Sequence, residues 1–150
     1  MSNSLFVTAS GVRSPGFSDL TGSPTAAQGV ASLLTASSVN LTAQTASIGT
    51  TTLFAVGSSG AGIYRVSYSG IDTSAGTSGD TLTVTIGWNN GSAAQSFTSS
   101  AVSLSSVGAE IAGDVFLFSA ASQNITYATT ASSVLGSPQY ALRLRIEYLG

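Results

Sequence analysis

The C-terminal stretch from Tyr140 to Tyr148 constrains the fold most strongly. Five large apolar residues alternate there with small or charged ones. A period of two residues is typical of a strand that buries one face. Each Leu or Ile that is fully buried contributes about 1.5 to 3 kcal/mol relative to exposure. A fraying terminus would leave this face in water, so the stretch predicts a core strand of a sheet. Its apolar set is Tyr140, Leu142, Leu144, Ile146 and Tyr148, and Arg143, Arg145 and Glu147 lie on the other face.

The chain between Val39 and Pro138 contains no proline, as a sheet interior requires. Apolar and polar residues alternate again around Tyr64–Tyr68, Leu82–Trp88 and Ile125–Thr129. The triplet Asn89-Asn90-Gly91 is a strong signal for a tight hairpin turn. Short strands at this spacing, with Gly, Ser and Asn turns and no amphipathic helix, predict an all-β fold. We therefore expect an antiparallel β-sandwich or jelly roll over residues 38–150.

Residues 1–37 have a different character from the rest of the chain. They contain Pro15 and Pro24, several turn signals and no sustained hydrophobic period. The sequence therefore predicts an irregular, extended N-terminal arm that precedes the sandwich.

The run Val115-Phe116-Leu117-Phe118 carries apolar side chains on both faces of its predicted strand. A strand with two apolar faces is normally covered on both sides. The run therefore predicts either a second layer or a contact with another subunit.

The residue types that are missing limit the chemistry. The chain has no Cys and no His, which removes disulfides, thiolate ligands and the commonest general base. The four arginines, without any lysine, are too few for a nucleic-acid surface, and no run approaches the ~20 apolar residues of a membrane span. We expect no catalytic residues, no cofactor, no metal, and neither nucleic acid nor membrane as a partner.

The surface composition favours protein contacts instead. Charged residues make up 7% of the chain, whereas ordinary domains have about 25%. Ser and Thr together number 46, so hydroxyl groups must supply much of the surface. Removing water from such a surface costs little free energy, so the surface is suited to packing against copies or partners.

Two weaker site signals have simpler interpretations. Asp72 and Asp80 flank a predicted loop and could hold a hard cation, but their spacing matches no calcium motif, so we expect ordinary loop residues. The tyrosines and Trp88 lie on the apolar phase of their strands, which favours a core position over a sugar-binding platform.

Four segments are distinctive when taken together: Leu41–Ile48, Gly62–Tyr68, Thr83–Trp88 and Tyr140–Arg145. As a set they resemble a module in tailed-bacteriophage virion proteins. The segment Gly62–Tyr68 and the closing strand also look like trimeric jelly rolls of the tumour-necrosis-factor and C1q type. The resemblance covers about residues 38–150 and implies a ten-strand-like sandwich, a homotrimer with the last strand near the threefold axis, and no catalysis.

This resemblance leads to a functional prediction. We expect a capsid decoration or cement protein that assembles in the host cytoplasm, trimerises and binds the major capsid protein on the outer surface of the virion. The alternative is a receptor- or glycan-binding knob of a head or tail fibre, although 37 residues before the sandwich leave room only for an arm. The expected subunit interface comprises Arg65, Tyr140, Arg143, Arg145 and Glu147, and the expected capsid contacts are Phe6, Arg13 and Phe17.

Overall fold

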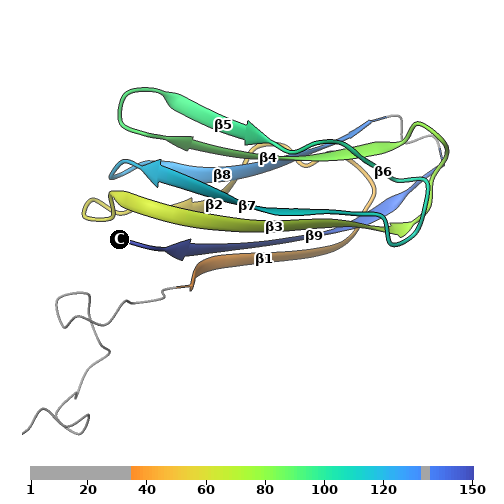
Figure 1. The fold of residues 1–150 in the computed structure, drawn as a ribbon, viewed down its shortest axis with the longest axis horizontal. Helices are drawn as coiled ribbons and strands as arrows, with labels where there is room; N and C mark the ends of the chain where they lie inside the picture. The colour runs from red at the N-terminus through yellow and green to blue at the C-terminus, as the bar shows by residue number, and fades with distance from the viewer. Residues whose placement is uncertain (1–34, 133–135) are drawn as a thin grey trace, which may run out of the picture. The chain divides into compact units, whose positions relative to one another are not determined.

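The computed structural model describes residues 35–132 and 136–150 (Figure 1). In those ranges, all regular secondary structure is β-strand, and turns and loops connect the strands. The all-β prediction is thereby confirmed. No helix in the described ranges is long and apolar enough to cross a membrane. The described part of the chain has nine strands: β1 (Thr35–Gln44), β2 (Thr51–Ala55), β3 (Gly62–Ser74), β4 (Thr81–Asn89), β5 (Ala94–Thr98), β6 (Val102–Ser103), β7 (Glu110–Ser119), β8 (Asn124–Ser132) and β9 (Gln139–Tyr148).

The strands form two antiparallel sheets with jelly-roll connectivity. One sheet has the order β1-β9-β3-β7, and the other has the order β2-β8-β4-β5 with the short β6 paired to β4. With β6 set aside, the first strand pairs with the last, the second with the second-last, and so on inward to the β4–β5 hairpin. This nested pairing is that of a jelly roll, so the predicted fold class is confirmed.

The β4–β5 hairpin is the innermost turn of this nested arrangement. The position of the hairpin was predicted correctly. The prediction of a tight turn was wrong, because residues 90–93 form a longer loop between the paired Asn89 and Ala94. The Asn90 carboxamide oxygen accepts hydrogen bonds from the amides of Ser92 at 3.0 Å and Ala93 at 2.9 Å. Gly91 has a φ of 92°, a conformation that glycine adopts without steric cost.

The core lies between the two sheets and is built from the alternating strands. Leu142 and Ile146 from β9 and Val66 from β3 meet Val84 and Ile86 from β4, and all five are fully buried. The alternation that predicted a central β9 is confirmed, because β9 pairs with both β1 and β3.

Residues 1–34 and 133–135 lie outside the described residues. Strand β1 begins at Thr35, close to the predicted boundary at residue 38. The extended arm therefore remains a prediction.

A chain of hydrogen bonds fastens the segment after β1 to the core. The Ile48 amide donates to the Thr129 hydroxyl at 2.9 Å, and that hydroxyl lies 2.7 Å from the Tyr140 hydroxyl. The Tyr140 hydroxyl donates in turn to the Ala46 carbonyl at 2.7 Å. Because a buried hydroxyl without a partner is costly, this chain fixes Tyr140 inside the sandwich.

The buried tyrosines predict a loss of stability at alkaline pH. Burial raises the pKa of Tyr140 above its ordinary 10.0, and the hydrogen bond with Thr129 offsets part of that rise. Burial also raises the pKa of Tyr64 and Tyr68. A folded-state pKa above the unfolded one stabilises the protein fully below about pH 10, and that contribution is lost as the pH rises further.

We expect the free energy of unfolding, measured by chemical denaturation, to fall steadily above about pH 10. Tyrosinate absorbance should rise together with unfolding for the buried rings. The Tyr140→Phe variant is the control and should show a shallower decline. A wild-type stability that does not change between about pH 9 and 11 would contradict the argument.

Candidate assembly surface

The outward face of the β1-β9-β3-β7 sheet brings distant residues into regular rows. Arg65 on β3 is paired with Phe116 on β7 and with Glu147 on β9. In the next row, Ser67 lies between Asp114 and Arg145. Residues that pair directly across strands project from the same face. The register therefore places charged and apolar side chains side by side on a single surface.

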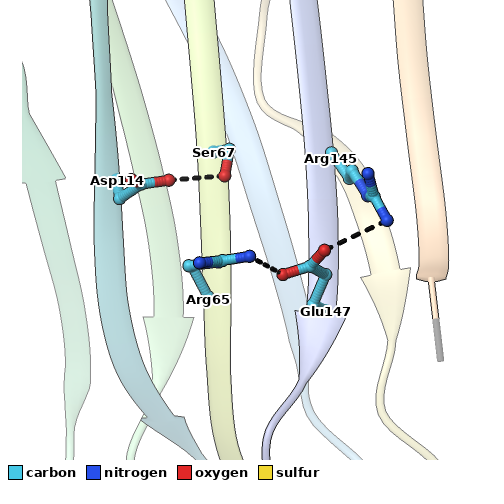
Figure 2. Close-up of polar contacts among 5 residues, drawn as sticks. All are labelled: Arg65, Ser67, Asp114, Arg145 and Glu147. Atoms are coloured by element: carbon cyan, nitrogen blue, oxygen red, sulfur yellow. Dashed lines mark hydrogen bonds and ion pairs between the residues drawn. The ribbon is translucent and has the colours of Figure 1, made fainter. Parts of the chain in front are cut away.

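Glu147 is the centre of an ion-pair network on this surface (Figure 2). Its carboxylate contacts the Arg65 guanidinium through one oxygen and Arg145 Nη2 at 3.1 Å through the other. The Glu147 side chain is only 4% exposed, whereas those of Arg65 and Arg145 are 38% and 51% exposed. The arginines therefore cover the carboxylate and remain open to solvent or to a partner.

The acidic side chains of β7 have different partners. Asp114 accepts a hydrogen bond from the Ser67 hydroxyl (Figure 2). Glu110 accepts one from the Ser69 hydroxyl at 2.8 Å. Both serines belong to β3, so neutral hydroxyls separate the β7 acids from the β9 arginines.

One end of the same face is apolar and exposed. Ile63 is paired with Phe118, and Phe116 follows in the next row. Leu149 joins this group, since its amide donates to the Ile63 carbonyl at 2.8 Å. The exposed fractions are 49% for Ile63, 64% for Phe116, 48% for Phe118 and 46% for Leu149. We call these four residues the apolar end.

The other sheet has a contrasting outward face. Thr83 pairs there with Thr130, Thr85 with Thr98, and Thr81 with Ser132. Within the described ranges, every charged residue except Asp72 and Asp80 lies on the outward face of the β1-β9-β3-β7 sheet. The sandwich thus has one face of hydroxyl groups and one face that carries charges and exposed apolar residues.

The structure places four of the five predicted interface residues on this charged face. Arg65, Arg143, Arg145 and Glu147 lie there, on β3 and β9. Tyr140 does not belong with them, because it is 1% exposed and faces the core. Its phase along β9 is that of Leu142 and Leu144, which already indicated an inward position. The predicted capsid contacts Phe6, Arg13 and Phe17 lie outside the described residues.

Sequence reasoning did not select the residues of the apolar end. The signal for two of them was the run Val115–Phe118 with its two apolar faces. Val115 and Leu117 are buried in the core, whereas Phe116 and Phe118 project outward on an edge strand. Within residues 35–132 and 136–150, Phe116 and Phe118 stay exposed on that second face. The subunit contact that the run suggested stays a prediction.

The loop flanked by Asp72 and Asp80 differs from the predicted solvated loop. Asp72 belongs to β3, and both side chains are buried. The Asp72 carboxylate accepts from the amides of Ser74 at 3.1 Å and Ser106 at 3.2 Å, and the Asp80 carboxylate accepts from the Thr77 amide at 2.8 Å. Their oxygens thus fasten neighbouring loops. Within residues 35–132 and 136–150, no group of three or more acidic, His or Cys side chains is placed to hold a metal.

Comparisons with known proteins yield only distant structural likenesses. No family model matches the chain, and no curated protein matches it. A pentameric capsid protein from metagenomic phage sequences shares 13% identity at a TM-score of 0.41, over 99% of this chain and 90% of that one. A second structure of a pentameric capsid protein from metagenomic phage sequences shares 12% at 0.37, over 99% and 76%. Eiger TNF from S. frugiperda shares 12% at 0.37, over 79% and 88%.

These neighbours are a phage capsid protein and a tumour necrosis factor, the two classes that the sequence resemblance named. All three TM-scores lie below 0.5. The jelly-roll assignment comes from the strand order and register of the chain itself.

The ion-pair network predicts a stability cost at Glu147. Glu147→Ala removes the carboxylate and leaves two arginines without it, so we expect the free energy of unfolding to fall by about 1 to 3 kcal/mol. Arg145→Ala is the matched control, because removing a half-exposed partner should cost less than about 1 kcal/mol. Urea denaturation of the three proteins tests the order. Equal losses for both variants would show that Glu147 is not the centre of the network.

Proposed function

We propose that this protein is a non-enzymatic structural protein of a tailed-bacteriophage virion, a decoration or cement protein that assembles through the charged face of its jelly roll. The observation that carries the proposal is the gathering of the apolar end and the Arg65–Glu147–Arg145 network on one outward face. Exposed apolar patches bounded by polar residues mark interaction surfaces.

The position of β7 supports a protein partner for this face. Among the described strands, β7 is at the edge of its sheet and pairs only with β3. A long edge strand with exposed Phe116 and Phe118 is a template for association unless something covers it. Coverage by another subunit removes these rings from water and contributes the hydrophobic stabilisation that the isolated sandwich lacks there.

The chemistry of the chain is consistent with a binding role. The 150-residue sequence lacks His and Cys, so the usual general base and the thiolate nucleophile are both missing from it. The buried acids Asp72 and Asp80 accept hydrogen bonds from loop amides. The proposed partners are therefore other proteins: further copies of the chain and the major capsid protein on the outer surface of the virion.

A homotrimer is the proposed assembly, as the sequence resemblance implies. The phage capsid neighbours are pentameric, and that state belongs to those proteins. A mass measurement distinguishes three subunits from five for this chain.

We expect a trimer of about 45 kDa, three times the chain mass of 14.9 kDa, in light scattering coupled to gel filtration. Changing Phe116 and Phe118 together to Ser should shift the protein to monomer, because the apolar contribution is lost. The control is Thr83→Ser with Thr130→Ser on the other sheet, which should leave the mass unchanged. A wild-type monomer at high concentration would contradict self-assembly.

The capsid role requires a separate measurement. We expect purified protein to co-sediment saturably with expanded capsids that lack it and not with host cells. Binding to cells but not to capsids would favour the fibre-knob alternative. Binding to neither sample would overturn both virion-surface roles.

A further inference from the structure

On the outward face of the β1-β9-β3-β7 sheet, the exposed acidic and basic side chains lie on different strands. Strand β7 contributes the acids Glu110 and Asp114, and it also carries Phe116 and Phe118. Strand β9 contributes Arg143 and Arg145 from the same face. Strand β3 runs between them, with Ser67 and Ser69 in the intervening rows. The face thus has an acidic, aromatic edge and a basic strip two strands away.

Within one subunit, the acids of β7 have hydrogen-bond partners on the neighbouring strand β3. The hydrogen bonds that Asp114 and Glu110 accept come from serine hydroxyls of β3. Neighbouring strands lie about 4.8 Å apart, so β7 and β9 are separated by roughly twice that distance. Arg145 directs its guanidinium to Glu147 on its own strand, away from β7 (Figure 2). Glu110, Asp114 and Arg143 are exposed, and the Arg145 side chain is 51% exposed. Both parts are therefore accessible to complementary charges on another copy.

We propose that the acidic, aromatic edge of β7 in one subunit packs against the basic strip of β9 in the next. This inference rests on the proposed self-assembly. A ring of three joins two different patches of each subunit, and the segregated charges identify which two meet. The partner is a second copy of this chain, because the same face supplies both halves of the contact.

The aromatic rings of the β7 edge also suit the arginines of the β9 strip. Phe116 is the most exposed residue of the apolar end, and an aromatic ring packs well on an arginine stem or guanidinium plane. Because β7 is an edge strand, its side chains can reach the face of a neighbour without obstruction from their own sheet. Next to β9, β1 presents the neutral Ser38 and Asn40, which create no competing charge.

Charge reversal tests the contact. Arg143→Glu should raise the dissociation constant of the assembly at least about tenfold by placing like charges together. Glu110→Lys with Asp114→Lys should raise the dissociation constant by a similar factor, because this double variant places like charges together by changing β7 instead of β9. The combined triple variant restores opposite charges and should recover association to within about threefold of wild type. Sedimentation equilibrium at low salt measures all four proteins.

The controls separate this contact from self-assembly in general. Ser96→Lys with Thr130→Lys adds positive charge to the other sheet and should leave association unchanged. If the lysine pair on β7 fails to fold, Glu110→Gln with Asp114→Asn removes the same charges and should still weaken association. A wild-type trimer that tolerates the reversals, or a triple variant weaker than either parent, overturns this contact alone. A wild-type monomer overturns the proposed self-assembly as well.

Discussion

The pairing of β9 between β1 and β3 is the constraint on which the rest of the structure depends. The inward residues Tyr140, Leu142 and Ile146 are almost completely buried, and the outward residues Arg145 and Glu147 build the ion-pair network. A shift of one residue in register would exchange the two sets and place charges in the core. The core and the charged outward face are therefore fixed by the same register, and neither can form without the other.

Local alternation made much of this predictable. It identified β9, β3 and β4, because each buries one face and each shows a period of two. The same parity places Tyr140 in the core together with Leu142, so its assignment to the interface did not follow from its own pattern. The order of strands was not predictable, because pairing between residues far apart in sequence leaves no local signal. The burial of Asp72 and Asp80 depends on loops that meet only after those strands have paired.

The two-sided run in β7 shows how a sequence pattern can indicate something that a single chain does not contain. Val115 and Leu117 are the β7 residues buried in the core. Within the described part of the chain, nothing packs on this face in a way that requires aromatic rings at 116 and 118. An edge strand that needed only solubility would carry polar residues there. The aromatic rings on that edge therefore favour a contact outside the described chain, and the register places them beside Arg65 and Ile63.

The scarcity of charge makes the location of each charged residue informative. Where a quarter of the residues are ionised, salt bridges on a surface are frequent and contribute little. This chain concentrates the charges of its described part on one face and leaves hydroxyl groups on the other. A neutral hydroxyl surface gives little discrimination between orientations, whereas a few opposed charges penalise wrong registers by like-charge contact. In the proposed assembly, the small set of charges on β3, β7 and β9 therefore orients the subunits, while the adjacent aromatic rings supply the attraction.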